Sequence, residues 1–385
     1  MTVQELKAAF QTAYGQEAEA VYFAPGRVNL IGEHTDYNGG SVFPCALSFG
    51  TYLLLRKNDK KMVNFRSLNQ PEIISLALDQ LTTPLDKLWV NYPLGVLAQF
   101  IKRGIKIKEG YDILIWGNVP NGAGLSSSAS LEVVTAYAMN DQLATGFNRT
   151  VLAQIGQKAE HEFAFVNCGI MDQFASANGA KDHAIHLNCD TLEFELVPVK
   201  LEGIKILISN THSPHKLDSG AYNQRVAECK LAVEQLNKVR PLKYLAELTE
   251  AEFEKIESAI TDVTAHKRAR HVVGEVQRTS DAVKALKAGD IVKFGQLMNA
   301  SHVSLRDDYE VTGPELDTMA EEAWKIDGVI GSRMTGGGFG GCTVSLVKDE
   351  AIEPFIANVG KAYEAKIGIK PEFYIAEIGD GACKL

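Results

Sequence analysis

Four ionisable side chains occur close together near the N-terminus, within residues 26–37 (Gly-Arg-Val-Asn-Leu-Ile-Gly-Glu-His-Thr-Asp-Tyr). They are Arg27, Glu33, His34 and Asp36. Val28, Leu30 and Ile31 can anchor the segment on a core, which leaves the charged groups to converge on something polar. Carboxylates, an imidazole and a guanidinium in one short segment suit a ligand with many hydroxyl groups. The alternative is a surface loop with solvated charges.

A second segment, residues 117–130, combines glycines and serines (Gly-Asn-Val-Pro-Asn-Gly-Ala-Gly-Leu-Ser-Ser-Ser-Ala-Ser). Gly122 and Gly124 let the backbone approach a ligand closely, and the helix that opens near Ser126 offers amides and a positive dipole end to an anion. Phosphate is the anion that this pattern indicates, and the serine hydroxyls add donors or an oxygen ligand for Mg²⁺. The segment is not a Walker A loop, because no Gly-Lys-Ser/Thr follows. A serine N-cap on an ordinary helix is the alternative.

A third segment, residues 335–341 (Thr-Gly-Gly-Gly-Phe-Gly-Gly), satisfies the dinucleotide-binding spacing G-x-G-x-x-G. That spacing marks a dinucleotide site only where it opens a helix after a strand. Residues 342–347 have β-branched alternation and predict a strand instead, so we reject a dinucleotide site. We expect a loop that lies flat against other backbone or a ligand, with a tight β-hairpin as the alternative.

The three segments resemble the three signature motifs of the GHMP small-molecule kinases, and residues 26–40 resemble the galactokinase family in particular. Ala-Glu-His at 159–161 and Cys-Gly-Ile-Met-Asp-Gln-Phe at 168–174 also match that family, in the same order and spacing. The resemblance covers nearly the whole chain. It implies an α+β fold of two domains, the first similar to ribosomal protein S5 and the second ferredoxin-like, with the active site in the cleft between them.

The resemblance also implies roles for individual residues. Asp172 is expected to be the general base, with Arg27 as a fixed positive charge beside it; the rival role for Asp172 is a helix N-terminal acid. The sugar is expected to contact Glu33, His34, Thr35, Asp36, Gly169 and Tyr222. ATP is expected to contact Ser67, Trp89, Tyr92, Gly122, Ala123, Gly124, Leu125, Ser126, Ser127 and Ser128. Mg²⁺ is expected to bind Ser128 and Glu160, directly or through water.

The activity that the resemblance implies is ATP-dependent phosphorylation of galactose at its anomeric hydroxyl, the first committed step of galactose catabolism (the Leloir pathway). A sister kinase for mevalonate, homoserine or N-acetylgalactosamine would keep both glycine loops, but would not be expected to keep Glu-His-Thr-Asp at 33–36. A non-catalytic galactose and ATP sensor would lack part of the serine loop, which is complete here at 126–130. A sugar-nucleotide dehydrogenase fails on the context of the third glycine segment.

Composition limits the other classes of function. A chain of 385 residues is long enough for two domains and a large core. Its net charge of -9 disfavours nucleic acid or an anionic membrane as a partner. No apolar run approaches the roughly 20 residues of a membrane span, and the N-terminus lacks the pattern of a signal peptide. The six cysteines include no C-x-x-C pair and are expected to be reduced, and no histidine pair has the partners of a zinc site. We expect a cytoplasmic monomer whose partners are galactose and ATP.

The pattern along the chain mixes strands and helices. Strands are predicted near residues 18–24, 41–56, 61–67, 72–78, 111–117, 184–187 and 204–209. Helices are predicted near residues 88–103, after 126, within 150–178, and near 219–239, 249–287, 290–304 and 314–326. Because no flexible linker interrupts them, we place a tight domain boundary near 178, giving domains 1–178 and 179–385. The last strand is able to return to the first domain.

Overall fold

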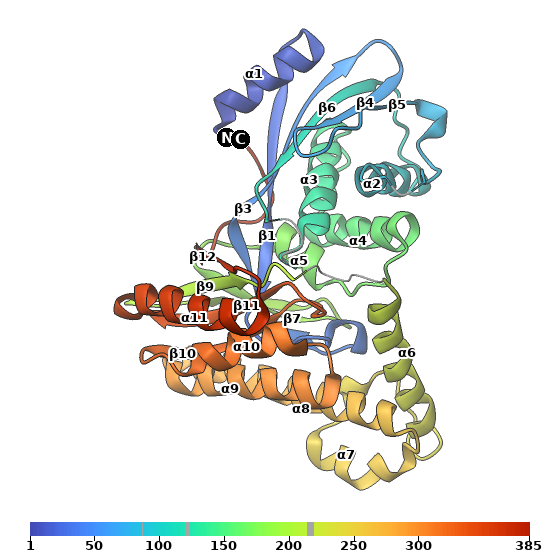
Figure 1. The fold of residues 1–385 in the computed structure, drawn as a ribbon. Helices are drawn as coiled ribbons and strands as arrows, with labels where there is room; N and C mark the ends of the chain where they lie inside the picture. Colours follow the sequence, from blue (N-terminus) through green and yellow to red (C-terminus); the bar gives the residue numbers. More distant parts are fainter. Residues whose placement is uncertain (87, 121–123, 214–218) are drawn as a thin grey trace.

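The computed structural model describes residues 1–86, 88–120, 124–213 and 219–385 and has an α+β fold (Figure 1). The first of its three sheets has six strands in the order β13 (Cys383–Lys384), β1 (Ala20–Asn29), β3 (Pro44–Asn58), β6 (Gly110–Gly117), β4 (Met62–Ser67) and β5 (Ile74–Ala77). Strand β13 pairs with β1, so the end of the chain belongs to the first sheet. Figure 1 accordingly shows both chain ends side by side.

Both faces of the first sheet are covered, because successive side chains of a strand point to opposite faces. Val21, Leu54 and Leu114 pack against α1 (Val3–Tyr14). Their neighbours Tyr22 and Leu53 belong to a larger core with the helices of the other face. Those helices are α2 (Asn91–Lys102), α3 (Ser127–Gln142), α4 (Arg149–Ala159) and α5 (Met171–Asn178).

The second sheet is antiparallel, in the order β10 (Val329–Thr335), β11 (Cys342–Lys348), β9 (Ile204–Asn210) and β12 (Glu372–Ala376). Leu207 and Val347 face α10 (Gly313–Trp324) and α11 (Ile352–Ile367). Ile206, Ile208 and Val344 face the opposite core, to which α9 (Ile291–Ser304) contributes.

Three further helices and a small sheet join these parts. The helices are α6 (Ser219–Leu236), α7 (Glu250–Ile256) and α8 (Val263–Lys287). The small sheet has the order β2 (Ser41–Val42), β7 (His183–Asn188) and β8 (Phe194–Pro198), so it connects the two halves of the chain. In the described part of the chain, no helix is both long enough and apolar enough to cross a membrane.

The structure divides two predicted elements and adds several. The strand predicted at 41–56 forms β2 and β3, which belong to different sheets. Residues 249–287 form two helices and not one stretch, because Thr249 caps α7 and Asp262 caps α8 with side-chain oxygens. The 3₁₀ turn Glu257–Ala259 separates them. Helices α1 and α11 and strands β8 and β12 were not predicted from the sequence.

Candidate active site

A cavity of about 430 Å³, a volume that suits a small molecule, opens where the three motif segments meet. Of the predicted site residues, its lining includes Arg27, Glu33, His34, Asp36, Tyr92, Gly124, Leu125, Ser126, Ser127, Ser128, Glu160, Gly169, Asp172 and Tyr222. Arg27, Glu33 and His34 are 3%, 1% and 4% exposed. The surface-loop alternative for residues 26–37 is therefore wrong.

Three predicted residues lie outside the lining that the described residues form: Thr35, Ser67 and Trp89. Thr35 is fully buried, and its hydroxyl donates to the carbonyls of Gly32 at 2.9 Å and Ser41 at 2.8 Å. It stabilises the turn that carries its neighbours. Trp89 packs against the first core, whereas Tyr92, one helical turn later, reaches the cavity.

Asp172 and Arg27 form a bidentate ion pair at one wall of the cavity. Nε and Nη2 of Arg27 donate to the two carboxylate oxygens, each at 2.8 Å. The third guanidinium nitrogen, Nη1, donates to the Gly124 carbonyl at 2.7 Å. Asp172 also lies in the first turn of α5, so the helix dipole favours the same carboxylate. The guanidinium therefore sets the orientation of Asp172 and ties it to the loop before α3.

The serine segment does not cap α3 in the ordinary way. Ser126 has a left-handed backbone with φ 61°, and its side chain makes no capping hydrogen bond. Its hydroxyl donates instead to Oδ2 of Asp172 at 2.6 Å. The N-cap alternative is therefore wrong for Ser126. Two residues of the same segment that were predicted to bind ATP, Gly122 and Ala123, lie outside the described residues.

Ser128 and Glu160 meet at the neighbouring wall, where the Ser128 hydroxyl donates to Oε1 of Glu160 at 3.2 Å. Glu160 begins the π-helix Glu160–Ala164, and burial together with the nearby charge of Asp172 raises its pKa to about 7. Oxygen donors of this kind fit Mg²⁺, which takes few protein ligands beside phosphate and water. Among the described residues, no group of three His, Cys, Asp or Glu side chains could hold a metal ion.

Asp36 depends on the absence of a side chain at Gly169. A Cβ atom added to Gly169 would lie 1.8 Å from Oδ2 of Asp36. The Asp36 carboxylate accepts a hydrogen bond from the Tyr37 amide at 3.0 Å. Burial, and next the charge of Asp172, raises its pKa to about 7. A hydrogen bond from a ligand hydroxyl would therefore stabilise the charged form of this carboxylate.

Glu33 is held on all sides by the protein. One oxygen accepts from the Gly336 amide at 2.7 Å, and the other lies 2.9 Å from Arg333 and accepts from Asn29. Arg333 is completely buried, and its partners lie in β1, in the turn after it and, at 4.0 Å, in α8 (Glu275). Glu33 therefore joins the first motif to the third glycine segment. The role of Arg333 was missed, because nothing in the local pattern of β10 marks a buried charge.

The third glycine segment is the hairpin connection between β10 and β11, and it also approaches other backbone closely. A Cβ on Gly336 would lie 3.0 Å from the Gly124 carbonyl, and a Cβ on Gly338 would lie 2.3 Å from the Val311 carbonyl. A strand follows, which confirms the rejection of a dinucleotide fingerprint. Gly336 and Gly337 line the cavity, so the hairpin alternative and the close-approach expectation both hold.

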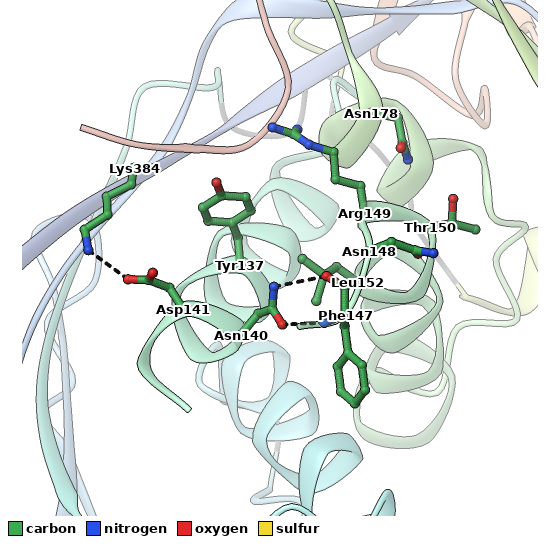
Figure 2. A pocket seen from close by; sticks show the side chains of 10 residues that line it. All are labelled: Tyr137, Asn140, Asp141, Phe147, Asn148, Arg149, Thr150, Leu152, Asn178 and Lys384. Atoms are coloured by element: carbon green, nitrogen blue, oxygen red, sulfur yellow. Dashed lines mark hydrogen bonds and ion pairs between the residues drawn. The ribbon is translucent and has the colours of Figure 1, made fainter. Parts of the chain in front are cut away.

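A second cavity, of about 610 Å³, lies between the end of α3, the start of α4, the end of α5 and β13 (Figure 2). Lys384 bonds Asp141 at 2.9 Å, and Asn140 bonds the backbone of Phe147. Arg149 lies over the Tyr137 ring and donates to a carbonyl of α5. The buried polar side-chain atoms that lack a partner in the described residues include none from this lining. Within the described residues, the polar side-chain atoms that this lining fully buries are therefore all paired.

Family models identify the class of the chain. The models "GHMP kinases N terminal domain" and "GHMP kinases C terminal" match residues 91–180 and 282–365. A crystal structure of mevalonate kinase has a TM-score of 0.66 over 94% of this chain and 99% of that one, and its 18% identity indicates the fold alone. The chain has the two-domain α+β fold of the GHMP kinases.

Closer relatives narrow that class. The "Galactokinase galactose-binding signature" matches residues 8–57. The galactokinases of Clostridium beijerinckii and Fusobacterium nucleatum are 49% and 51% identical; each covers 100% of this chain, with 99% and 98% of those proteins matched. The crystal structure of Lactococcus lactis galactokinase complexed with galactose has a TM-score of 0.98 and 44% identity over all of both chains. The chain belongs to the galactokinase family of GHMP kinases.

Proposed function

We propose that the cavity binds galactose and ATP together, and that Asp172 accepts the proton of the anomeric hydroxyl as the γ-phosphoryl group is transferred. Galactose phosphorylation follows from membership of the family, and the sister-kinase and sensor alternatives are not favoured. The bidentate pair of Arg27 and Asp172 carries the proposal. It holds a carboxylate and a fixed positive charge side by side, between the sugar motif and the phosphate loop.

The hydrogen bonds of Asp172 support a specific atom as the proton acceptor. A carboxylate has about four lone-pair directions, two on each oxygen. Arg27 occupies one on each oxygen, and Ser126 occupies a second on Oδ2. Within the described residues this leaves one direction on Oδ1, which we assign to the sugar proton. Arg27 would offset the charge that develops on the transferring group.

We propose that Asp36, His34, Tyr222 and the backbone of Gly169 read the sugar hydroxyls. All four line the cavity. Glu33 would act mainly by holding the glycine segment, because its oxygens already accept hydrogen bonds from the protein. A rigid arrangement of this kind aligns the hydroxyl with the phosphoryl group, which is a large part of catalysis in phosphoryl transfer.

We propose that residues 124–128 hold the phosphates of ATP, with Tyr92 on the same wall, and that Ser128 and Glu160 hold Mg²⁺. Mg²⁺ neutralises charge on the β- and γ-phosphates. The raised pKa of Glu160 supports its part, since a nearby cation would offset a buried negative charge. Ser67 and Trp89 would contact ATP only if the nucleotide extends beyond the described lining of the cavity.

We also propose a monomer in the cytoplasm with a domain boundary near residue 178. Strands before residue 118, together with β13, fill the first sheet, and strands after residue 203 fill the second. The small sheet spans the boundary, which supports a tight junction.

ADP release with different acceptors tests the proposed activity. Galactose should give rapid ADP release, whereas N-acetylgalactosamine, mevalonate, homoserine and no acceptor should give little. A sensor would bind galactose without releasing ADP. Equal release with every acceptor would contradict a sugar-specific kinase.

A further inference from the structure

His34 lies at the sugar end of the cavity in a strained conformation. Its φ of 62° is in the left-handed region, which residues other than glycine rarely adopt. Asn38 holds the turn, since its Nδ2 donates to the His34 carbonyl at 2.8 Å. Burial lowers the pKa of His34 well below its ordinary value, so the ring is neutral. A neutral imidazole has one donor nitrogen and one acceptor nitrogen, and the tautomer decides which of them faces the sugar.

A chain of hydrogen bonds leads away from the His34 ring into the protein. Nδ1 of His34 lies 2.8 Å from the Tyr37 hydroxyl, which lies 2.7 Å from the Tyr309 hydroxyl. The Tyr309 oxygen lies 3.1 Å from Sγ of Cys229. Tyr309 and Cys229 are almost completely buried, so water does not compete for these bonds. Two proton orders therefore fit these distances, one running toward His34 and one running away from it.

The far end of the chain decides between these two orders. Nδ2 of Asn38 lies 3.6 Å from Sγ of Cys229, so the sulfur accepts there. Burial raises the pKa of the Cys229 thiol to about 11, and its proton is therefore present at neutral pH. The order of donors that uses this thiol proton runs from Cys229 to the Tyr309 oxygen, from Tyr309 to Tyr37, and from Tyr37 to Nδ1 of His34. The reverse order would leave the buried thiol proton without a partner, so burial favours the order that ends at His34.

We propose that Tyr37 and Tyr309 are positioning residues that hold His34 with its proton on Nε2, so that the ring offers the sugar a hydrogen-bond donor. Nε2 is buried, and it has no hydrogen-bond partner in the described part of the chain. The inference rests on the proposed function, in which His34 contacts galactose.

The proposal has a consequence for substrate recognition. A donor at Nε2 needs only an acceptor on the sugar. A fluorine in place of the contacted hydroxyl should therefore accept part of this hydrogen bond, whereas a hydrogen in its place accepts none. That position can be found by measuring a panel of monodeoxy and monofluoro galactoses as substrates of the wild type and of His34→Ala. It is the position at which the fluoro sugar is better than the deoxy sugar in the wild type but not in His34→Ala. If the ring instead accepted a hydrogen bond, the fluoro sugar would be no better than the deoxy sugar at every position, which would overturn the proposal.

Two conservative variants test the chain itself. Tyr37→Phe should raise the KM for galactose about 5- to 10-fold while kcat changes less than about 2-fold, because a fixed bond to a binding residue is lost. Tyr309→Phe should raise the KM about 2- to 3-fold, because Tyr37 remains to donate to His34. Tyr363→Phe is the matched control, because its buried hydroxyl donates to the Thr211 carbonyl at 2.8 Å in the second sheet region. It should lower the melting temperature and leave the KM unchanged.

Nitrogen NMR of the His34 ring gives a readout that stability does not affect. The His34 signals, assigned by their loss in His34→Ala, should show a protonated Nε2 and a bare Nδ1, and Tyr309→Phe should shift them toward a mixture of tautomers. A proton on Nδ1 in the wild type, or an unchanged KM in both tyrosine variants, would overturn the proposal. An unchanged galactose KM in His34→Ala would show that His34 does not contact galactose, which contradicts the proposed function. The NMR spectrum would still report separately which nitrogen of the ring carries the proton. Should Tyr37→Phe fail to fold, Tyr309→Phe and the wild-type spectrum decide.

Discussion

What sets the two cavities of this molecule apart as candidate sites is their polar groups, and not their volume. The second cavity is the larger, at about 610 Å³ against about 430 Å³. Its lining comes mainly from residues 137–152 and two other elements, Lys384 pairs with Asp141 and Asn140 bonds the Phe147 backbone, and none of its fully buried side-chain atoms lacks a partner in the described residues. The first cavity draws residues from segments as far apart as Arg27 and Gly337, and it retains unpaired or strained groups such as His34. Unpaired polar groups, and not volume, distinguish the candidate active site.

The pKa values of two aspartates express the same contrast. Burial raises the pKa of Asp36 in the first cavity, whereas hydrogen bonds from Tyr22 and Lys384 lower the pKa of Asp141 beside the second. The surroundings of Asp36 disfavour its negative charge, whereas the surroundings of Asp141 favour it. Replacing each with asparagine compares a functional carboxylate with a structural one.

The largest expected effect concerns sugar specificity. Glucose differs from galactose only in the direction of the 4-hydroxyl, and it should be a poorer substrate by about 10⁴ to 10⁵ in kcat/KM if Asp36 accepts a hydrogen bond from the axial 4-hydroxyl. Asp36→Asn should reduce that ratio strongly, whereas Asp141→Asn should keep it. Steady-state kinetics with both sugars measures it, and an unchanged ratio in Asp36→Asn would assign discrimination to another residue.

The next effect concerns the proton acceptor. Asp172→Asn keeps the shape of the side chain but removes its basicity, so kcat should fall about 10²- to 10⁴-fold while nucleotide binding survives. Asp141→Asn is the control and should turn over normally. A modest loss in Asp172→Asn, together with a greater loss in Arg27→Ala, would indicate that the positive charge dominates and the proton leaves late.

The metal prediction is intermediate in size. Ser128→Ala with Glu160→Gln should raise the Mg²⁺ concentration needed for half-maximal turnover by about 10-fold or more, because two oxygen donors are lost. Glu162 lies in the same π-helix as Glu160 but pairs with Lys102 at the surface. The control variant Glu162→Gln should therefore keep the wild-type Mg²⁺ dependence. Identical Mg²⁺ titrations of the double variant and the wild type would leave the backbone amides as the phosphate site.

Stability should depend on pH with opposite signs at the two aspartates. The folded pKa of Asp36 is raised to about 7, so its contribution to stability is lost as pH rises through about 7. Asp36→Asn should therefore gain melting temperature relative to the wild type between pH 5 and pH 8. The folded pKa of Asp141 is lowered, so Asp141→Asn should lose stability above about pH 4 and show no further trend between pH 5 and pH 8. Thermal melts without ligand measure both, and equal trends would refute the contrast.

The smallest effect concerns the second cavity alone. Lys384→Ala removes a pair with Asp141 that is half exposed, which should cost less than about 1 kcal/mol of stability. Kinetic constants for galactose and ATP should stay at wild-type values. A large change in KM would show that the second cavity communicates with the first.

Much of the site could be predicted from the sequence because its chemistry lies in short segments. The charged cluster at 26–37, the serine segment and Asp172 all reach one cavity. The family resemblance implied that Thr35 touches the sugar, but a turn directs its hydroxyl to backbone carbonyls. Arg333 could not be anticipated, because its partner Glu33 is 300 residues away and β10 shows only an ordinary strand pattern.

By itself, the sequence determined the class of chemistry and the elements with strong periodicity. Local patterns encode those features, since side chains three or four residues apart share a helix face and alternate residues share a strand face. Only the tertiary structure decided that Ser126 bonds Asp172 instead of capping α3, and that a chain of hydroxyls from Cys229 reaches His34. These contacts join residues far apart in sequence, and their direction depends on which donors and acceptors burial leaves without water.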